Sequence, residues 1–213
     1  MPRITRDDLD RFMHFGFLPA TRTIYLGEAR LDTDTYEGGG PGVDYRLADQ
    51  IIKSICILES INTEPITIIV NNPGGDEYHG LAIYDAIRAT PCRVTVRIIG
   101  QAMSMAAWFT QAADHRIMFP NATMMIHYGY MGLPPVHTHT FERWGKEVGR
   151  LNKLMEGHFM ERILEKIPKY TVKKLRERLL FDSFLTAHEA VDLGLADEVF
   201  EFPERAARDN TAS

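Results

Sequence analysis

The hydrophobic positions of the chain follow two patterns, short continuous runs and a spacing of three or four residues. The continuous runs are rich in β-branched residues and predict buried strands. They span residues 23–26, 66–70, 94–99, 116–119 and 123–126. The spaced positions predict amphipathic helices and comprise Leu47, Ile51, Ile52, Ile55, Cys56 and Leu58, then Leu81, Tyr84 and Ile87. Strands that alternate with helices predict right-handed crossovers in a mostly parallel sheet, and hence an α/β fold.

A longer apolar stripe follows in the second half of the chain. Its members recur at helical spacing and are Phe141, Trp144, Val148, Leu151, Met155 and Phe159. They predict one long amphipathic helix over about 141–166. The stripe is too apolar for a helix standing alone, so we expect it to pack against another subunit. We assign a flexible N-terminal segment to 1–22, one domain to 23–200 and a polar tail to 201–213.

The composition excludes several classes of protein. The 213 residues carry 24 Lys and Arg against 29 Asp and Glu, a net charge of −5. Because no long basic run occurs, we expect no nucleic-acid partner. No stretch is long and apolar enough to span a membrane, and the polar N-terminus lacks a secretory core. Cys56 and Cys92 lie in apolar segments, and we interpret them as buried free thiols of a soluble intracellular protein, with a single disulfide as the alternative.

Ser104 stands where the 94–99 strand gives way to small and apolar residues at 106–113, which predict a buried helix. A serine at such a junction either caps the helix or acts as a nucleophile near the positive end of the helix dipole. Its methionine and alanine neighbours favour a desolvated hydroxyl, in which one hydrogen bond has a larger effect.

Two further residues supply the chemistry that a serine nucleophile needs. His127 ends the 123–126 strand, and Asp182 lies in the apolar stretch 179–185. A carboxylate buried there needs a partner, and an imidazole N–H is a suitable one. Acyl transfer requires a nucleophile, a base and an orienting acid. Taken alone, each residue also has a simpler interpretation, with His127 a strand-end histidine and Asp182 a turn former.

Backbone N–H groups near the serine are candidates for binding an oxyanion. The turn at Gly74 and Gly75 exposes such groups, and the N–H of Met105 follows Ser104 into the helix. The glycines are not followed by Lys-Ser or Lys-Thr, so they do not form a phosphate loop. The pair of histidines at 137 and 139 lacks a third ligand at useful spacing, so we expect no metal site.

Four motifs together resemble the ClpP family of serine peptidases. They are NPGG at 72–75, GQAMSMA at 100–106, MIH at 125–127 and DSFLTAHEA at 182–190. The resemblance covers roughly residues 23–199. It implies that Ser104 is the nucleophile, His127 the general base and Asp182 the orienting acid. It also implies that the backbone N–H groups of Gly75 and Met105 bind the oxyanion.

The resemblance implies an architecture as well as a site. Members of this family have a ClpP/crotonase-like spiral of β-β-α units, from which a handle helix protrudes, here about 128–166. They form seven-membered rings that stack in pairs around a chamber. An AAA+ ATPase feeds polypeptide substrates into it, so ATP is used by the partner and no cofactor is expected in this chain. A cytoplasmic location follows, with an organelle or a virus-infected cell as alternatives.

Some features depart from the family pattern and leave other functions open. The glycine-rich stretch 35–42 resembles an insertion, and Pro134 and Pro135 interrupt a stretch that the family uses as a strand. Phe181 stands where many relatives carry a charged residue. A non-catalytic ring subunit is therefore one alternative. A crotonase-type acyl-CoA enzyme is another, because it shares the spiral fold and a pocket of two N–H groups.

Overall fold

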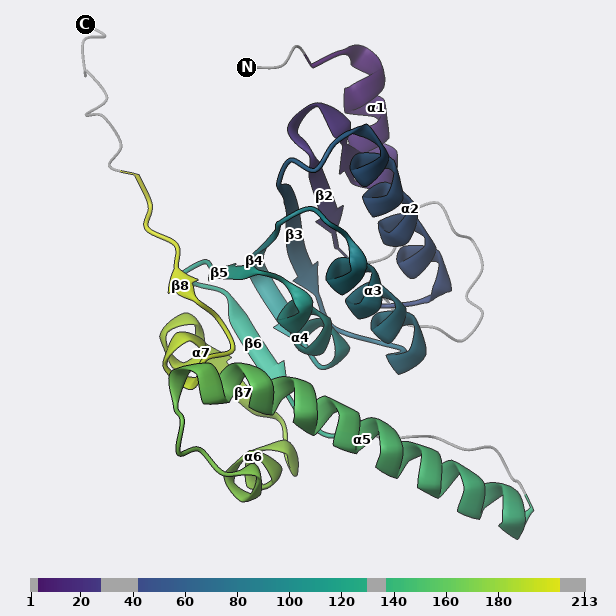
Figure 1. The fold of residues 1–213 in the computed structure, drawn as a ribbon, viewed down its shortest axis with the longest axis vertical. Coiled ribbons are helices and arrows are strands. Elements are labelled where there is room, and N and C mark those ends of the chain that lie inside the picture. Colours follow the sequence, from purple (N-terminus) through teal and green to yellow (C-terminus); the bar gives the residue numbers. More distant parts are fainter. Residues whose placement is uncertain (1–3, 28–41, 130–136, 204–213) are drawn as a thin grey trace, which may run out of the picture.

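A computed structural model describes residues 4–27, 42–129 and 137–203 (Figure 1). The expectations for the glycine-rich stretch at 35–41, for Pro134 and Pro135 and for the tail beyond 203 lie outside these ranges. The strands are β1 (Phe17–Leu18), β2 (Thr23–Leu26), β3 (Ile66–Asn72), β4 (Val94–Met103), β5 (His115–Met118), β6 (Thr123–Ile126), β7 (Ser183–Thr186) and β8 (Glu198–Val199). The helices are α1 (Arg6–Phe15), α2 (Tyr45–Ile61), α3 (Glu77–Ala89), α4 (Met105–Phe109), α5 (Thr138–Lys166), α6 (Val172–Leu179) and α7 (Ala187–Leu193).

The strands form one mixed sheet whose main path is β1-β2-β3-β4-β5-β8, with β6 paired to β4 and β7 paired to β6. Within the described chain only the β1–β2 and β6–β7 pairs are antiparallel, which confirms the mostly parallel sheet. β4 changes partner along its length, from β5 at 95–98 to β6 at 101–103. Gly100, with φ 79°, lies at this change, and a Cβ there would approach Asn71 Oδ1 to 2.7 Å. Because of this change of partner, the last residues of β4 lie beside β6 rather than beside β5.

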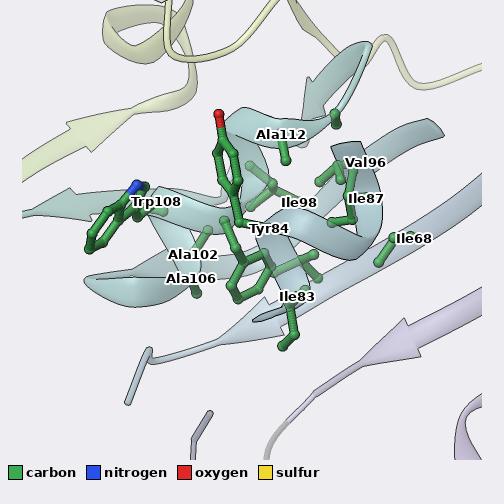
Figure 2. Packing of buried hydrophobic residues seen from close by; sticks show 14 of the residues in the cluster. Ile68, Ile83, Tyr84, Ile87, Val96, Ile98, Ala102, Ala106, Trp108 and Ala112 are labelled. Carbon is green, nitrogen blue, oxygen red and sulfur yellow. The ribbon is translucent and has the colours of Figure 1, made fainter. Parts of the chain in front are cut away.

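The main core lies between this sheet and helices α2, α3 and α4 (Figure 1). Figure 2 shows side chains of β3, β4 and α3 meeting those of α4, among them Ile68, Ile83, Val96 and Ala106. Every residue of α4 is buried, as the run of small and apolar residues predicts. Gly80 lets α3 approach α4 closely, because a Cβ there would overlap the Met105 side chain. The packing therefore fixes the helix that begins just after Ser104.

Helix α5 begins three residues before the predicted helix and ends where it was predicted to end. In the second half of α5 the stripe packs onto the chain's own core, with Leu151, Met155 and Phe159 buried. The first half extends beyond the rest of the molecule (Figure 1) and leaves Phe141 and Trp144 exposed. The described chain thus buries the apolar stripe over only the second half of α5.

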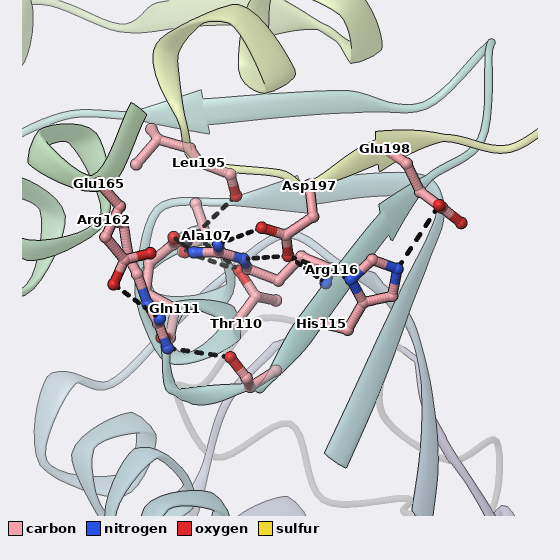
Figure 3. Close-up of polar contacts among 11 residues, drawn as sticks. Ala107, Thr110, Gln111, His115, Arg116, Arg162, Glu165, Leu195, Asp197 and Glu198 are labelled. Atoms are coloured by element: carbon pink, nitrogen blue, oxygen red, sulfur yellow. Dashed lines mark hydrogen bonds and ion pairs between the residues drawn. The ribbon is translucent and has the colours of Figure 1, made fainter. Parts of the chain in front are cut away.

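A buried cation ties the C-terminal segment to β5 (Figure 3). The Arg116 side chain is 2% exposed, and its Nη2 lies 2.6 Å from Asp197 Oδ1. Its Nε donates to Asp197 Oδ2 at 2.9 Å and its Nη1 to Gln111 Oε1 at 2.8 Å. Arg162 on α5 donates to the carbonyls of Gln111 and Ala113, both at 2.9 Å. Burial alone would raise the pKa of Asp197, but the hydrogen bonds from Arg116 lower it overall.

Several local features differ from the sequence-based expectation. Where a flexible segment was expected at 1–22, α1 forms with a capping box between Thr5 and Asp8. Cys56 is exposed rather than buried, whereas Cys92 is buried, and both thiols are free. Elements α6, β7 and β8 were not predicted. No helix in the described part of the chain is both long and apolar enough to cross a bilayer.

Candidate active site

Ser104 occupies the junction between β4 and α4 in a strained backbone conformation. Its φ is 53° and its ψ is −121°, a region that residues with a Cβ rarely adopt. The Ser104 side chain makes no capping hydrogen bond to α4. The interpretation of Ser104 as a helix cap is therefore wrong, and the hydroxyl is available for another partner.

The strand registers explain why the other two residues meet Ser104. Met103 pairs with Met125 in the parallel β4–β6 ladder, and the Ser104 N–H continues it by donating to the Met125 carbonyl at 2.8 Å. In the antiparallel β6–β7 ladder, Ile126 pairs with Ser183. Continuing that register by one residue places His127 opposite Asp182. Ser104 and His127 thus follow the ends of β4 and β6, and Asp182 immediately precedes the start of the antiparallel β7 beside them.

These side chains form a continuous hydrogen-bonded series. His127 Nε2 lies 2.7 Å from Ser104 Oγ, and His127 Nδ1 lies 3.0 Å from Asp182 Oδ1. An ionised carboxylate only accepts, so Nδ1 carries the proton and Nε2 accepts from the Ser104 hydroxyl. The imidazole is 12% exposed and the Asp182 side chain 58%. Asp182 was expected to be embedded among apolar neighbours, and in this chain it is not.

The apolar neighbours of Asp182 are themselves exposed. Leu180 is 63% exposed, Phe181 79% and Phe184 59%. They flank the carboxylate that contacts His127 and form an apolar rim that the described part of the chain leaves exposed. We call Leu180, Phe181 and Phe184 the β7 rim. Exposed aromatic and aliphatic groups in such density are typical of a surface that contacts another protein.

The glycine turn after β3 lies directly against the serine. A Cβ on Gly74 would lie 2.8 Å from Ser104 Cβ and 3.0 Å from Met105 N, so only glycine allows this approach. Gly75 is held by a bridge to Val43, in which the Val43 N–H donates to the Gly74 carbonyl at 2.7 Å. Among the described residues, no acceptor pairs with the N–H of Gly75 or of Met105. The Met105 donor directly follows Ser104 and the Gly75 donor follows the glycine that approaches it, and neither has an acceptor among residues 4–27, 42–129 and 137–203.

Tyr128, the residue that follows His127, belongs to a group of polar side chains that the sequence did not predict. The Tyr128 hydroxyl donates to Glu156 on α5, and Arg176 on α6 donates to the same carboxylate, its Nη2 at 2.8 Å. Burial and this hydrogen bond raise the pKa of Tyr128 to about 12. Burial would raise the pKa of Glu156, but Arg176 and Tyr128 lower it overall. Glu156 is 7% exposed. Its place in the apolar stripe was the signal in the sequence that it would need a polar partner.

Comparison with known proteins agrees with this geometry. A family model described as Clp protease matches residues 39–203. The chain belongs to the Clp protease family. It is 33% identical over 165 residues to an ATP-dependent Clp protease proteolytic subunit of Deinococcus radiodurans, covering 76% of this chain and 78% of that one. It is 31% identical over 175 residues to proteolytic subunit 2 of Corynebacterium jeikeium, covering 79% and 80%.

A solved structure of the Clp protease family shares the fold. A ClpP1 variant from Listeria monocytogenes superposes with a TM-score of 0.71 at 26% identity, covering 87% of this chain and 94% of that one. The expected ClpP-like fold is thereby confirmed. Across residues 4–27, 42–129 and 137–203, no group of three or more His, Cys, Asp or Glu side chains is arranged to hold a metal ion.

Proposed function

We propose that this chain is a serine endopeptidase of the Clp type that uses Ser104, His127 and Asp182 as its catalytic residues. The observation that carries the proposal is the 2.7 Å contact between Ser104 Oγ and His127 Nε2, with Asp182 3.0 Å from the other ring nitrogen. This is the order of contacts that serine acyl transfer requires. Membership of the Clp protease family supports the same reaction.

The proposed mechanism is a sequence of proton transfers that the observed contacts support. Ser104 Oγ attacks the peptide carbonyl while His127 Nε2 takes its proton, and Asp182 stabilises the imidazolium that forms. The N–H groups of Gly75 and Met105 bind the oxyanion of the tetrahedral intermediate. His127 then gives its proton to the leaving amine. Water repeats the cycle on the acyl-enzyme and releases the acid product.

The proposal includes assembly and partners. The exposed half of α5 and the β7 rim are apolar surfaces suited to contacts between copies of the chain in stacked rings. A further apolar groove, of about 740 Å³, lies between α1 and α2 and includes Phe15, Phe17, Tyr45, Ile57 and Ile61. Its open, apolar character supports a docked protein partner, which we propose is an AAA+ unfoldase that supplies unfolded polypeptide. We also propose a cytoplasmic location, in keeping with the two free cysteines.

The decisive experiment removes the Ser104 hydroxyl. We expect Ser104→Ala to lower kcat for peptide cleavage by on the order of 10⁴-fold or more, since the nucleophile is lost. The particle mass from light scattering should not change. A fluorophosphonate probe should label the unmodified protein at residue 104 and leave Ser104→Ala unlabelled. Ser60→Ala, which removes an exposed hydroxyl on α2, is the matched control and should behave as the unmodified chain.

Two results would contradict the proposal. Peptide cleavage retained by Ser104→Ala would exclude the assigned nucleophile. An assembled protein that neither cleaves peptides nor reacts with the probe would instead indicate a non-catalytic ring subunit. Turnover of acyl-CoA thioesters by such a protein would indicate a crotonase-type enzyme, which needs the two N–H donors but no serine.

A further inference from the structure

Beside the three residues of the proposed triad, the described chain places a further carboxylate, that of Glu77, within electrostatic reach of His127. Glu77 is the first residue of α3 and follows Gly75 by two positions. Its side chain lies over Gly129, two positions after His127, so closely that a Cβ on Gly129 would overlap its Oε1. Glu77 therefore bridges the two backbone segments that flank the serine, one from the end of β3 and one from the end of β6.

The charge of Glu77 is not balanced within the described chain. No described side chain forms an ion pair or a hydrogen bond with its carboxylate. Burial raises the pKa of Glu77 and neighbouring Asp76 raises it further, while His127 lowers it. Asp76, by contrast, already serves as the N-cap of α3, accepting from the His79 N–H at 2.9 Å. Asp76 thus already accepts a backbone hydrogen bond, whereas among the described residues no hydrogen bond is made to the Glu77 carboxylate.

The position of Glu77 in the first turn of α3 has a structural explanation, but it is incomplete. A negative charge there stabilises the helix dipole, and any exposed acid would serve. That explanation does not account for a side chain that folds over Gly129 and loses part of its hydration. A partly desolvated carboxylate beside the reacting groups is more favourable when a cation shares the site.

We propose that Glu77 selects substrates with a lysine or arginine side chain at one of the two residues that flank the scissile bond. This specificity rests on the peptidase function proposed above. A substrate whose carbonyl lies at Ser104 Oγ brings its flanking side chains to the same site, and a lysine or arginine side chain is long enough to reach a carboxylate at its edge. An apolar side chain would desolvate Glu77 further without pairing it, and an acidic one would be repelled.

The test compares two matched series of fluorogenic peptides on the assembled protein. In one series only the residue before the scissile bond varies, and in the other only the residue after it, each through Lys, Leu and Glu. We expect kcat/KM for Lys to exceed that for Leu by about ten-fold in one series, with Glu lowest. Glu77→Gln should abolish most of this preference, and Glu77→Lys should reverse the order of Lys and Glu.

The ratio between substrates, rather than the rate, is the informative quantity. Removing Glu77 also changes the electrostatic support of the His127 imidazolium, which affects all peptides alike and cancels in the ratio. Asp85→Asn, on the exposed face of the same helix, is the matched control and should leave the ratio unchanged. The preference should also weaken with added salt, because it depends on charge.

The outcomes separate this proposal from the peptidase function. If the unmodified protein cleaves peptides and reacts with fluorophosphonate, but Glu77→Gln has the same Lys-to-Leu ratio in both series, the specificity proposal is overturned and the peptidase stands. If no peptide is cleaved and Ser104 is unreactive, both fail together. A ratio that falls equally in Asp85→Asn assigns the preference to general surface charge and also overturns the role of Glu77.

Discussion

The molecule holds two aspartates against nitrogen partners in contrasting ways. Asp197 contacts Arg116, whose side chain is 2% exposed and whose other donors reach Gln111. Asp182 contacts His127 through one ring nitrogen, and its own side chain is 58% exposed. Both contacts join the C-terminal part of the chain to the sheet. In the first contact the cation is buried and the Asp197 side chain is 31% exposed, whereas in the second the Asp182 side chain is 58% exposed.

The difference shows which part of the molecule is complete as a single chain. The Arg116 group satisfies its donors and acceptors internally, so its geometry needs no other protein. Asp182 is flanked by the exposed β7 rim, so its surroundings change when that rim is covered. An exposed carboxylate is also hydrated, and hydration competes with its hydrogen bond to His127. The first aspartate pairs with a buried cation of the fold, whereas the second lies beside an apolar surface that the described chain leaves exposed.

Replacing Asp182 should have the largest effect on activity. We expect Asp182→Asn to lower kcat by roughly 10³ to 10⁴-fold, because the amide favours the wrong imidazole tautomer. The free energy of unfolding should change by no more than about 0.5 kcal/mol, since the side chain is mostly exposed. Steady-state peptide cleavage and urea unfolding followed by tryptophan fluorescence measure the two quantities.

The control for this variant is a neighbouring change that keeps the acid. Ser183→Ala removes a hydroxyl next to Asp182 that accepts from Arg178 at 3.2 Å, and it should retain nearly full activity. Comparable loss in both variants would mean that the β7 strand as a whole matters rather than the carboxylate. Full activity in Asp182→Asn would remove Asp182 from the mechanism.

Replacing Asp197 should have the opposite profile, with a large effect on stability and a small effect on activity. We expect Asp197→Asn to lower the free energy of unfolding by about 3 kcal/mol, because it leaves the buried Arg116 guanidinium without its counter-charge. The kcat of the protein that remains folded should change less than about two-fold, since no triad residue contacts Asp197. Urea unfolding and active-site titration with fluorophosphonate distinguish lost folding from lost chemistry.

The pH dependence gives the sign of the Asp197 effect. The folded-state pKa of Asp197 is lowered, so its stabilisation is present above pH 3.8, the ordinary aspartate pKa, and is lost as the pH falls through the folded value. The stability difference between Asp197→Asn and the unmodified chain should therefore shrink in acid. Asp192→Asn, an exposed change on α7, is the control. A difference that persists below the folded pKa would point to packing rather than charge.

The sequence indicated Ser104 and His127 because each follows a locally recognisable strand, whereas Asp182 was assigned from its apolar neighbours and from the resemblance to the ClpP family. Strand patterns are local, and parallel strands that end together place residues 104 and 127 at one edge. The Arg116–Asp197 and Tyr128–Glu156 contacts could not be predicted, because they join residues 81 and 28 positions apart along the chain and only tertiary packing brings them together. Helix α1 escaped prediction for another reason: it buries no residue, so its signals are confined to its ends, in the capping box at Thr5 and the glycine C-cap at Gly16.

The burial of Asp182 was also misjudged, and the cause is physical. Hydrophobic neighbours in sequence predict burial of a strand, but they do not say whether the covering surface belongs to the same chain. Leu180, Phe181 and Phe184 are apolar and exposed here. The same applies to the first half of α5. A single-chain pattern cannot separate a core from an interface, because both remove the same apolar area from water.

Replacing Tyr128 should change stability and activity less than the changes at Asp197 and Asp182, respectively. Tyr128 follows His127 in the chain, and its hydroxyl reaches Glu156, which Arg176 also binds. We expect Tyr128→Phe to lower the free energy of unfolding by about 1 kcal/mol, since Glu156 loses one donor and keeps the other. Because the ring still packs, His127 should shift only slightly, and kcat should fall a few-fold with KM unchanged.

The ionisation of Tyr128 makes this prediction specific. Its folded-state pKa is about 12, above the ordinary 10.0, so its contribution is complete below pH 10.0 and is lost as the pH rises toward 12. The stability advantage of the unmodified chain over Tyr128→Phe should therefore fall across that interval. If the hydroxyl only filled space, the difference would be independent of pH and kcat would not change. A pH-dependent difference together with a reduced kcat would show that Glu156 on α5 helps to position His127, and hence that the long helix and the triad are mechanically joined.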